Sequence, residues 1–113
     1  MSVPILENIV RQHAEQAAFL WTVYDRALLY HDENPDMDAD RLARVVEQLE
    51  AHLDGHRVAG ADGLRIAEER LAEYREPGEL FVVRMLQPRA EGMTVEGLDL
   101  EKAREYLDRE LCR

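Results

Sequence analysis

The sequence predicts an all-α fold, a compact bundle of about five helices with short connections that forms a single domain over residues 1–113. Apolar residues recur at three- and four-residue intervals along most of the chain, which is typical of helices with one buried face. The one short run that could be a strand, FVV at residues 81–83, has no partner strand elsewhere, and a lone strand is unstable. A chain of 113 residues has the length of one domain and can bury a core without disulfides or a metal.

The first predicted helix is the longest and ends near Tyr30 or His31. Ser2 can cap it, and Pro4 suits its first turn, where a missing N–H costs no helical hydrogen bond. Small residues in its middle would let another helix approach closely, and we expect Trp21 to be buried against the second helix. The apolar positions at helical spacing are Ile5, Ile9, Val10, Ala14, Ala17, Leu20, Trp21, Tyr24 and Leu28.

The segment HDENPDMDAD, residues 31–40, is predicted to be a loop, because Asn34 precedes a proline and is therefore disfavoured in helical geometry. Asp38 is expected to cap the next helix, with the other acids near its positive end. The same acids are the candidate contact surface for a protein partner. The five are Asp32, Glu33, Asp36, Asp38 and Asp40.

A calcium loop is a weaker interpretation of these acids. The EF-hand pattern needs a glycine at its sixth position and a glutamate at its twelfth. Counted from Asp36, the twelfth position is Glu47 but the sixth is Arg41; counted from Asp32, neither residue fits. The pattern therefore does not favour calcium.

The second predicted helix spans about Ala39–Val58, and Gly60 is expected to end it. Gly55, inside this helix, is expected to mark a close contact with another helix. Asp62 is expected to cap a third helix over residues 63–75. The inner faces of the two helices comprise Leu42, Val45, Val46, Leu49, Leu53 and Val58 in one, and Leu64, Ala67, Leu71 and Tyr74 in the other.

A fourth helix is expected to begin at Pro77 and to end before Pro88. The spacing of its apolar residues Leu80, Val83 and Leu86 favours a helix over a strand. After the linker PRAEGMTVEG, the last helix is expected over residues 99–111. Its inward positions are Leu100, Ala103, Tyr106 or Leu107, and Leu111.

The composition is strongly acidic, with 24 acids against 14 bases and a net charge of −10. Phosphate contacts need clustered Lys and Arg, so we expect no nucleic-acid partner. No apolar run is long enough to span a membrane, and the N-terminus lacks the pattern of a secretory signal. These observations favour a cytoplasmic protein. An acidic surface serves solubility, or it attracts a basic protein partner.

The sequence holds no constellation of catalytic residues. Ser2 is the only serine and lies at a terminus, and Cys112, the only cysteine, lies at the other. Neither has a triad pattern around it, and no glycine-rich phosphate loop is present. We therefore expect no catalytic residues, no cofactor and no enzyme activity.

His52 and His56 are the one pair with metal-ligand spacing, because side chains four residues apart share a helix face. The glutamate that follows the first histidine in zinc hydrolases is replaced by Leu53. His13 or His31 could supply a third ligand, but nothing in the spacing selects either. The alternative, two histidines on a partly exposed helix, is favoured.

Three runs, QHAEQAAFLW, EAHLDGHRVAGADG and EPGELF, carry a resemblance that covers about residues 8–87. Over this range the chain resembles the N-terminal helical region of a bacterial family whose members continue into HEAT-like repeats. Those members are several times longer, and residues 89–113 have no counterpart in the pattern. Genes of this family lie in type VI secretion clusters, so the resemblance implies a protein-binding role and supplies no catalytic residues.

Together these observations indicate a non-catalytic protein-binding protein, specifically an immunity protein that binds and blocks a type VI secretion toxin. The alternative is an adaptor or chaperone that loads an effector onto the secretion system. A second alternative is a metal-dependent helical enzyme that uses His52 and His56. The expected partner is a secreted toxin or effector, with no nucleic acid and no membrane.

Overall fold

The computed structural model describes residues 4–33, 35–90, 92–95, 97–98 and 100–111. The described residues form five α-helices and two short 3-10 helices and no strand, which confirms the all-α prediction. In chain order these are α1 (Pro4–Leu29), η1 (His31–Glu33), α2 (Ala39–Val58), α3 (Ala61–Glu73), α4 (Pro77–Leu86), η2 (Pro88–Ala90) and α5 (Leu100–Leu111).

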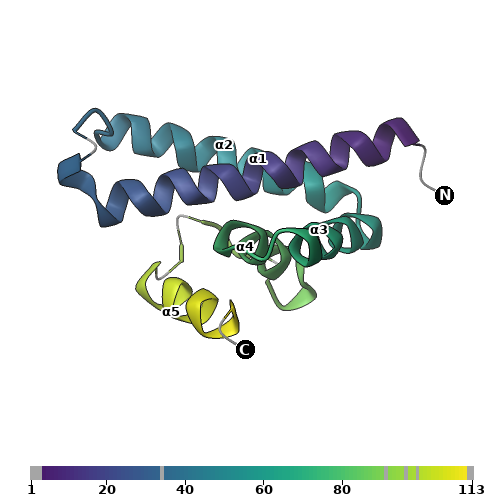
Figure 1. Cartoon of the computed structure of the whole chain (residues 1–113). Coiled ribbons are helices and arrows are strands. Elements are labelled where there is room, and N and C mark those ends of the chain that lie inside the picture. The colour runs from purple at the N-terminus through teal and green to yellow at the C-terminus, as the bar shows by residue number, and fades with distance from the viewer. Residues whose placement is uncertain (1–3, 34, 91, 96, 99, 112–113) are drawn as a thin grey trace.

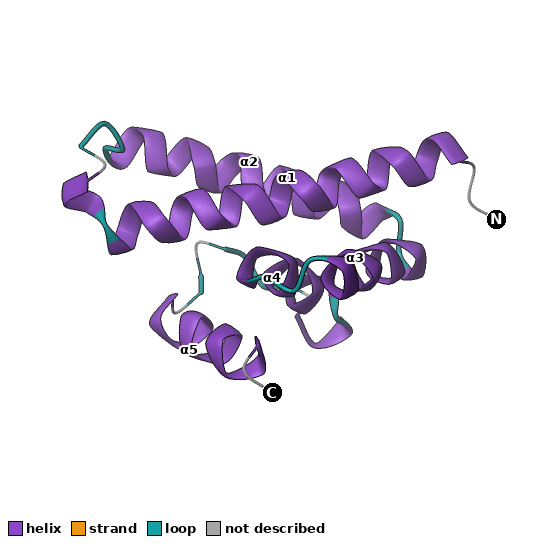
Figure 2. Ribbon diagram, viewed as in Figure 1, coloured by secondary structure: helices purple, strands orange, loops and turns teal. Residues whose placement is uncertain are grey.

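The two longest helices, α1 and α2, lie antiparallel and side by side as a hairpin, and α3 and α4 pack beneath it (Figure 1). The last helix, α5, packs on α4, and its Arg104 also forms an ion pair with Asp25 of α1 at 2.6 Å. Short loops join the helices from α1 to α4, as Figure 2 shows. The hairpin is therefore the frame of the molecule, and its two ends have different surroundings.

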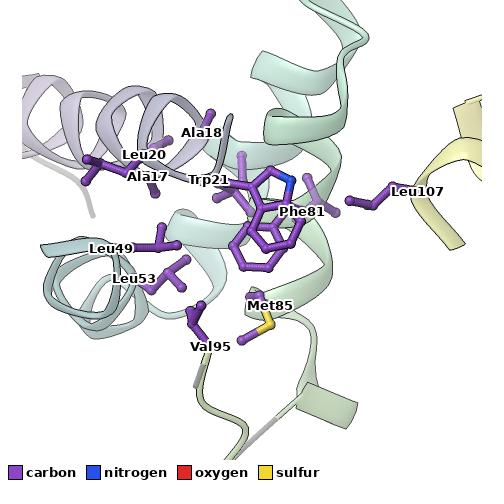
Figure 3. Close-up of a cluster of buried hydrophobic side chains, with 14 residues drawn as sticks. Ala17, Ala18, Leu20, Trp21, Leu49, Leu53, Phe81, Met85, Val95 and Leu107 are labelled. Atoms are coloured by element: carbon purple, nitrogen blue, oxygen red, sulfur yellow. The ribbon is translucent and has the colours of Figure 1, made fainter. Parts of the chain in front are cut away.

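The core is centred on Trp21 of α1, whose side chain is 1% exposed. Its indole stacks on the ring of Phe81 from α4, with centroids 4.1 Å apart and planes inclined by 10° (Figure 3). Leu49 and Leu53 of α2 belong to the same buried cluster. The predicted burial of Trp21 is confirmed, and its ring partner comes from α4 in addition to the expected packing against α2.

A stretch of small residues in α1 allows α4 to approach, as the sequence predicted for some helix. Ala14, Ala17 and Ala18 are buried. A Cβ atom added at Gly78, in the first turn of α4, would lie 2.5 Å from the backbone oxygen of Ala18. No real Cβ sits that close to backbone, so the glycine is required for this helix contact.

The joint between α2 and α3 corrects two predictions. Gly60 has a positive φ of 60° and precedes α3, which begins at Ala61, so Asp62 lies in the first turn and does not cap it. Val58 was expected in the core but is 88% exposed. Val58 follows Leu49 by nine residues, which is about 180° around a helix of 3.6 residues per turn. It therefore faces away from the buried side.

The C-terminal half follows the expected pattern with small changes. Pro77 begins α4 and Pro88 follows its end, as predicted. The side chain of Leu107 in α5 is buried and that of Tyr106 is half-buried. Between the helices, Val95 is buried and its backbone N–H donates to the Glu50 carboxylate of α2. This hydrogen bond fastens the linker to the hairpin.

Candidate functional site

The turn between α1 and α2 carries the five acids that the sequence selected as a contact surface. We call residues 30–40, apart from residue 34, the acidic tip. The Asp38 side chain accepts a hydrogen bond from the backbone N–H of Arg41 at 2.9 Å, so its predicted role as the cap of α2 is confirmed. The side chains of all five acids are exposed: Asp32, Glu33, Asp36, Asp38 and Asp40.

A hollow of about 480 Å³ lies where the end of α1 meets the turn, and Glu33 is the one of these five acids that lines it. Phe19, one helical turn before Val23 of this hollow, is 61% exposed on the side of α1 opposite the core. Tyr30 is 48% exposed. The sequence analysis missed the hollow, because it forms only when the turn folds back over α1. Its lining residues are Val23, Arg26, Ala27, Tyr30, Glu33 and Met37.

The acidic tip stands apart from the rest of the molecule. Its 3-10 turn, η1, contacts α1 and none of the other described helices. Figure 1 shows the turn at the end of the hairpin away from α3. A partner could therefore reach the acids and the hollow together without displacing any helix of the bundle.

The opposite end of the hairpin is held by ion pairs between α1 and α3, which the sequence analysis missed. Three pairs join the two helices: Arg65 with Glu7 at 2.6 Å, Arg11 with Glu69 at 3.2 Å, and the largely buried Arg70 with Glu15 at 3.0 Å. These acids are matched by arginines and are poor candidates for contact with a basic partner.

Arg70 also approaches a second carboxylate, that of Glu79 in α4, at 3.4 Å. Burial raises the pKa of Glu79, and the nearby Arg70 only partly opposes that shift. Both side chains are largely buried, so this pair links α3 to α4 inside the bundle. Its role is structural.

The structure separates His52 from His56, and the favoured interpretation of two histidines on a partly exposed helix is wrong for His56. The ring of His56 is fully buried, and its Nε2 hydrogen-bonds with the backbone oxygen of Gly63 in α3. His52 instead meets His13 of α1, with 2.9 Å between their Nδ1 atoms. Among the described residues, no group of three or more His, Cys, Asp and Glu side chains lies close enough together to hold a metal ion jointly.

The surroundings of His52 and His56 both favour neutral rings. Burial, and then the nearby His13, lower the pKa of His52. Burial also lowers the pKa of His56, against the opposing effect of the carbonyl groups of Gly63 and Val10. Each ring is therefore an uncharged part of the α1–α2–α3 contact at neutral pH.

Two glycines provide the space for these rings. A Cβ atom at Gly55 would lie 3.0 Å from Nε2 of His13, which confirms the expected close helix contact at this position. A Cβ atom at Gly63 would lie 2.5 Å from the backbone oxygen of His56. The first contact is with a side chain that can move, and the second is with backbone that cannot.

The peripheral residues Ser2 and Cys112 lie outside the described residues. Within the part of the chain that is described, no helix is long and apolar enough to cross a membrane. No family model matches this sequence, and no curated protein and no solved structure matches it either.

Proposed function

We propose that this chain is a non-catalytic binding protein that docks onto a basic protein through its acidic tip, and that it serves as an immunity protein against a type VI secretion toxin. One observation carries the proposal: five exposed carboxylates gather at a protruding end of the fold, and one of them, Glu33, lines a hollow of mixed polar and apolar character. The net charge of −10 adds a long-range attraction to a basic partner.

The tip has the two parts that a tight interface needs. Apolar and aromatic side chains at the centre of an interface contribute most of the binding energy, and charged residues at the rim steer and orient the partner. Here the exposed ring of Tyr30 lies within the tip, and the exposed ring of Phe19 lies eleven residues earlier, in α1. The matching partner surface is an apolar anchor side chain flanked by Lys and Arg, as occurs around clefts that bind anionic substrates.

Charge distinguishes the tip from the other concave surface of the molecule. A groove of about 300 Å³ lies between α4 and α5 and is mostly apolar. Its described lining includes two cations, Arg84 and Lys102, and no acid. A basic partner is therefore better matched by the acidic tip.

The specific assignment to immunity rests on the resemblance over residues 8–87. Genes of the family that the chain resembles lie in type VI secretion clusters. An immunity protein must occupy a toxin's functional surface, while an adaptor must bind without blocking activity. The test is co-expression with the effector encoded beside this gene. Protection of the cells supports immunity, and binding without protection indicates the adaptor role.

A charge-reversal variant of the acidic tip, used in the same co-expression experiment, tests whether this surface makes the contact. The variant Asp36→Lys/Asp40→Lys changes two exposed acids there and leaves the Asp38 cap intact. The control Glu47→Lys/Glu68→Lys makes the same change of net charge at exposed positions outside the tip. Loss of protection in the first variant alone supports docking through the tip, while equal protection by both variants contradicts it.

A further inference from the structure

One pair of side chains lies far along the hairpin from the acidic tip and takes no part in it. His13 of α1 and His52 of α2 face each other with their Nδ1 atoms 2.9 Å apart and their ring centroids 5.2 Å apart. Both side chains are half-buried, so water and dissolved ions reach the rings. The contact joins residues that are 39 apart in the sequence.

Neither ring has a carboxylate partner among the described residues. The residues one turn away on both helices, which are the surface neighbours of the pair, carry no Asp, Glu, Lys or Arg. The hydrogen-bond partner of each ring is the other ring. One Nδ1 atom donates the shared proton and the other accepts it, so this hydrogen bond uses one nitrogen of each ring. These neighbours are Ile9, Val10, Gln16, Ala17, Gln48, Leu49, Gly55 and His56.

We propose that His13 and His52 bind one divalent transition-metal ion, such as Zn²⁺ or Ni²⁺, between their Nδ1 atoms and so clip α1 to α2. Bonds from such ions to histidine nitrogen are about 2.0–2.1 Å long, which places two ligand nitrogens on one ion roughly 2.9–3.4 Å apart. The observed separation of 2.9 Å lies at the short end of this range. Water completes the coordination on the exposed side of the pair.

The chemistry of the pair determines the class of ion. A metal ligand must present the lone pair of a neutral imidazole, and the Nδ1 atoms of the two rings face each other. Imidazole nitrogen is a good ligand for zinc, nickel and copper and a poor one for calcium or magnesium, so the transition metals are the expected class.

Gly55, beside the pair, leaves space for the ring of His13. Gly55 costs its helix about 1 kcal/mol relative to alanine. A Cβ atom there would press on Nε2 of His13 from 3.0 Å. The glycine thus leaves room for the ring in its position against His52. His56 is not a third ligand, because its Nε2 is engaged by the Gly63 carbonyl and its ring is fully buried.

The test is calorimetric titration of the full chain with Zn²⁺ and with Ni²⁺, in a Cys112→Ser background that removes the only thiol. The expected result is one ion per chain, with affinity at least tenfold weaker in His13→Asn and in His52→Asn. His31→Asn is the matched control, because it removes a histidine beyond the far end of α1 and should leave the affinity unchanged. No stoichiometric binding, or equal affinity in all three variants, overturns the proposal.

Two further measurements guard against a variant that fails to fold. Gly55→Ala retains both ligands but displaces the ring of His13. It should therefore weaken the binding of the ion while leaving the far-ultraviolet circular dichroism spectrum unchanged. In the unaltered chain, Zn²⁺ should shift the imidazole NMR signals of His13 and His52 and leave those of His31 in place. Shifts confined to other histidines would show that the ion binds elsewhere and would overturn the proposal.

Discussion

The two ends of the α1–α2 hairpin use acidic side chains in opposite ways. At the end next to α3, Glu7, Glu15 and Glu69 pair with arginines, and the buried ring of His56 bonds to Gly63. At the other end the five carboxylates are exposed, and the 3-10 turn that carries Asp32 and Glu33 packs against α1. The first end holds the fold together, and the second is the surface that we propose for docking. Net charge alone does not separate these two roles, but the placement of the arginines does.

The largest expected effect comes from the core beneath the hairpin. Trp21→Ala removes a ring that is 1% exposed and stacked on Phe81, so it should lower the free energy of unfolding by about 3–5 kcal/mol. Phe19→Ala, two residues away on the same helix, removes a ring that is 61% exposed and should change the stability by less than about 0.5 kcal/mol. Urea unfolding of both variants measures the difference, and equal losses would contradict the assignment of buried and exposed faces.

A smaller loss is expected at the end next to α3. Gly63→Ala places a Cβ atom 2.5 Å from the backbone oxygen of His56, so α2 and α3 must separate at a cost of about 1–3 kcal/mol. Gly55→Ala meets only the movable ring of His13, and the gain of about 1 kcal/mol in helix propensity offsets that contact. In thermal unfolding, the midpoint temperature of Gly63→Ala should therefore be lower than that of Gly55→Ala. The reverse order would show that the helices are not in close contact at Gly63.

The stability contributed by the end of the hairpin next to α3 should decrease at low pH. Burial lowers the pKa of His56 below its ordinary 6.5, so the folded chain binds fewer protons than the unfolded chain. Stability from this neutral ring is complete above pH 6.5 and decreases as the pH falls below it. Urea midpoints between about pH 8 and pH 5, measured with a chelator present, should decrease less in His56→Gln than in the unaltered chain. Identical pH profiles would argue that His56 is already protonated or exposed in the folded state.

The smallest effect on stability is expected at the acidic tip. Asp36→Lys/Asp40→Lys alters exposed side chains away from the core, so unfolding should shift by less than about 0.5 kcal/mol. A loss above about 2 kcal/mol would mean that these acids support the fold. In that case their exposure would not mark a binding surface.

Local signals predicted the helices well. The bounds of α2 at Ala39–Val58 match the prediction, because Asp38 caps one end and Gly60 follows the other. The prediction for Asp62 was wrong because the turn at Gly60 starts α3 earlier than a side-chain cap would. The prediction for Val58 was wrong because this residue lies about 180° around the helix axis from the buried Leu49.

Contacts between distant residues were beyond the reach of the sequence. Composition located the acids of the tip, but the hollow depends on Met37 meeting Val23 and Ala27 across the turn. In the same way, the spacing of His52 and His56 on one helix did not predict the contact of either ring. The partner of His52 is His13, and only the packing of α1 against α2 brings these two together.

The most direct test of the acidic tip as a docking surface is the affinity of the proposed partner toxin, once purified, for three forms of this chain, measured by calorimetry. The account predicts that Asp36→Lys/Asp40→Lys binds at least tenfold more weakly than the unaltered chain, because two favourable charges become repulsive. The control Glu47→Lys/Glu68→Lys, with the same net charge, should stay within about threefold. An equal loss in both variants would show that overall charge, and not the tip, determines binding, and it would contradict the account.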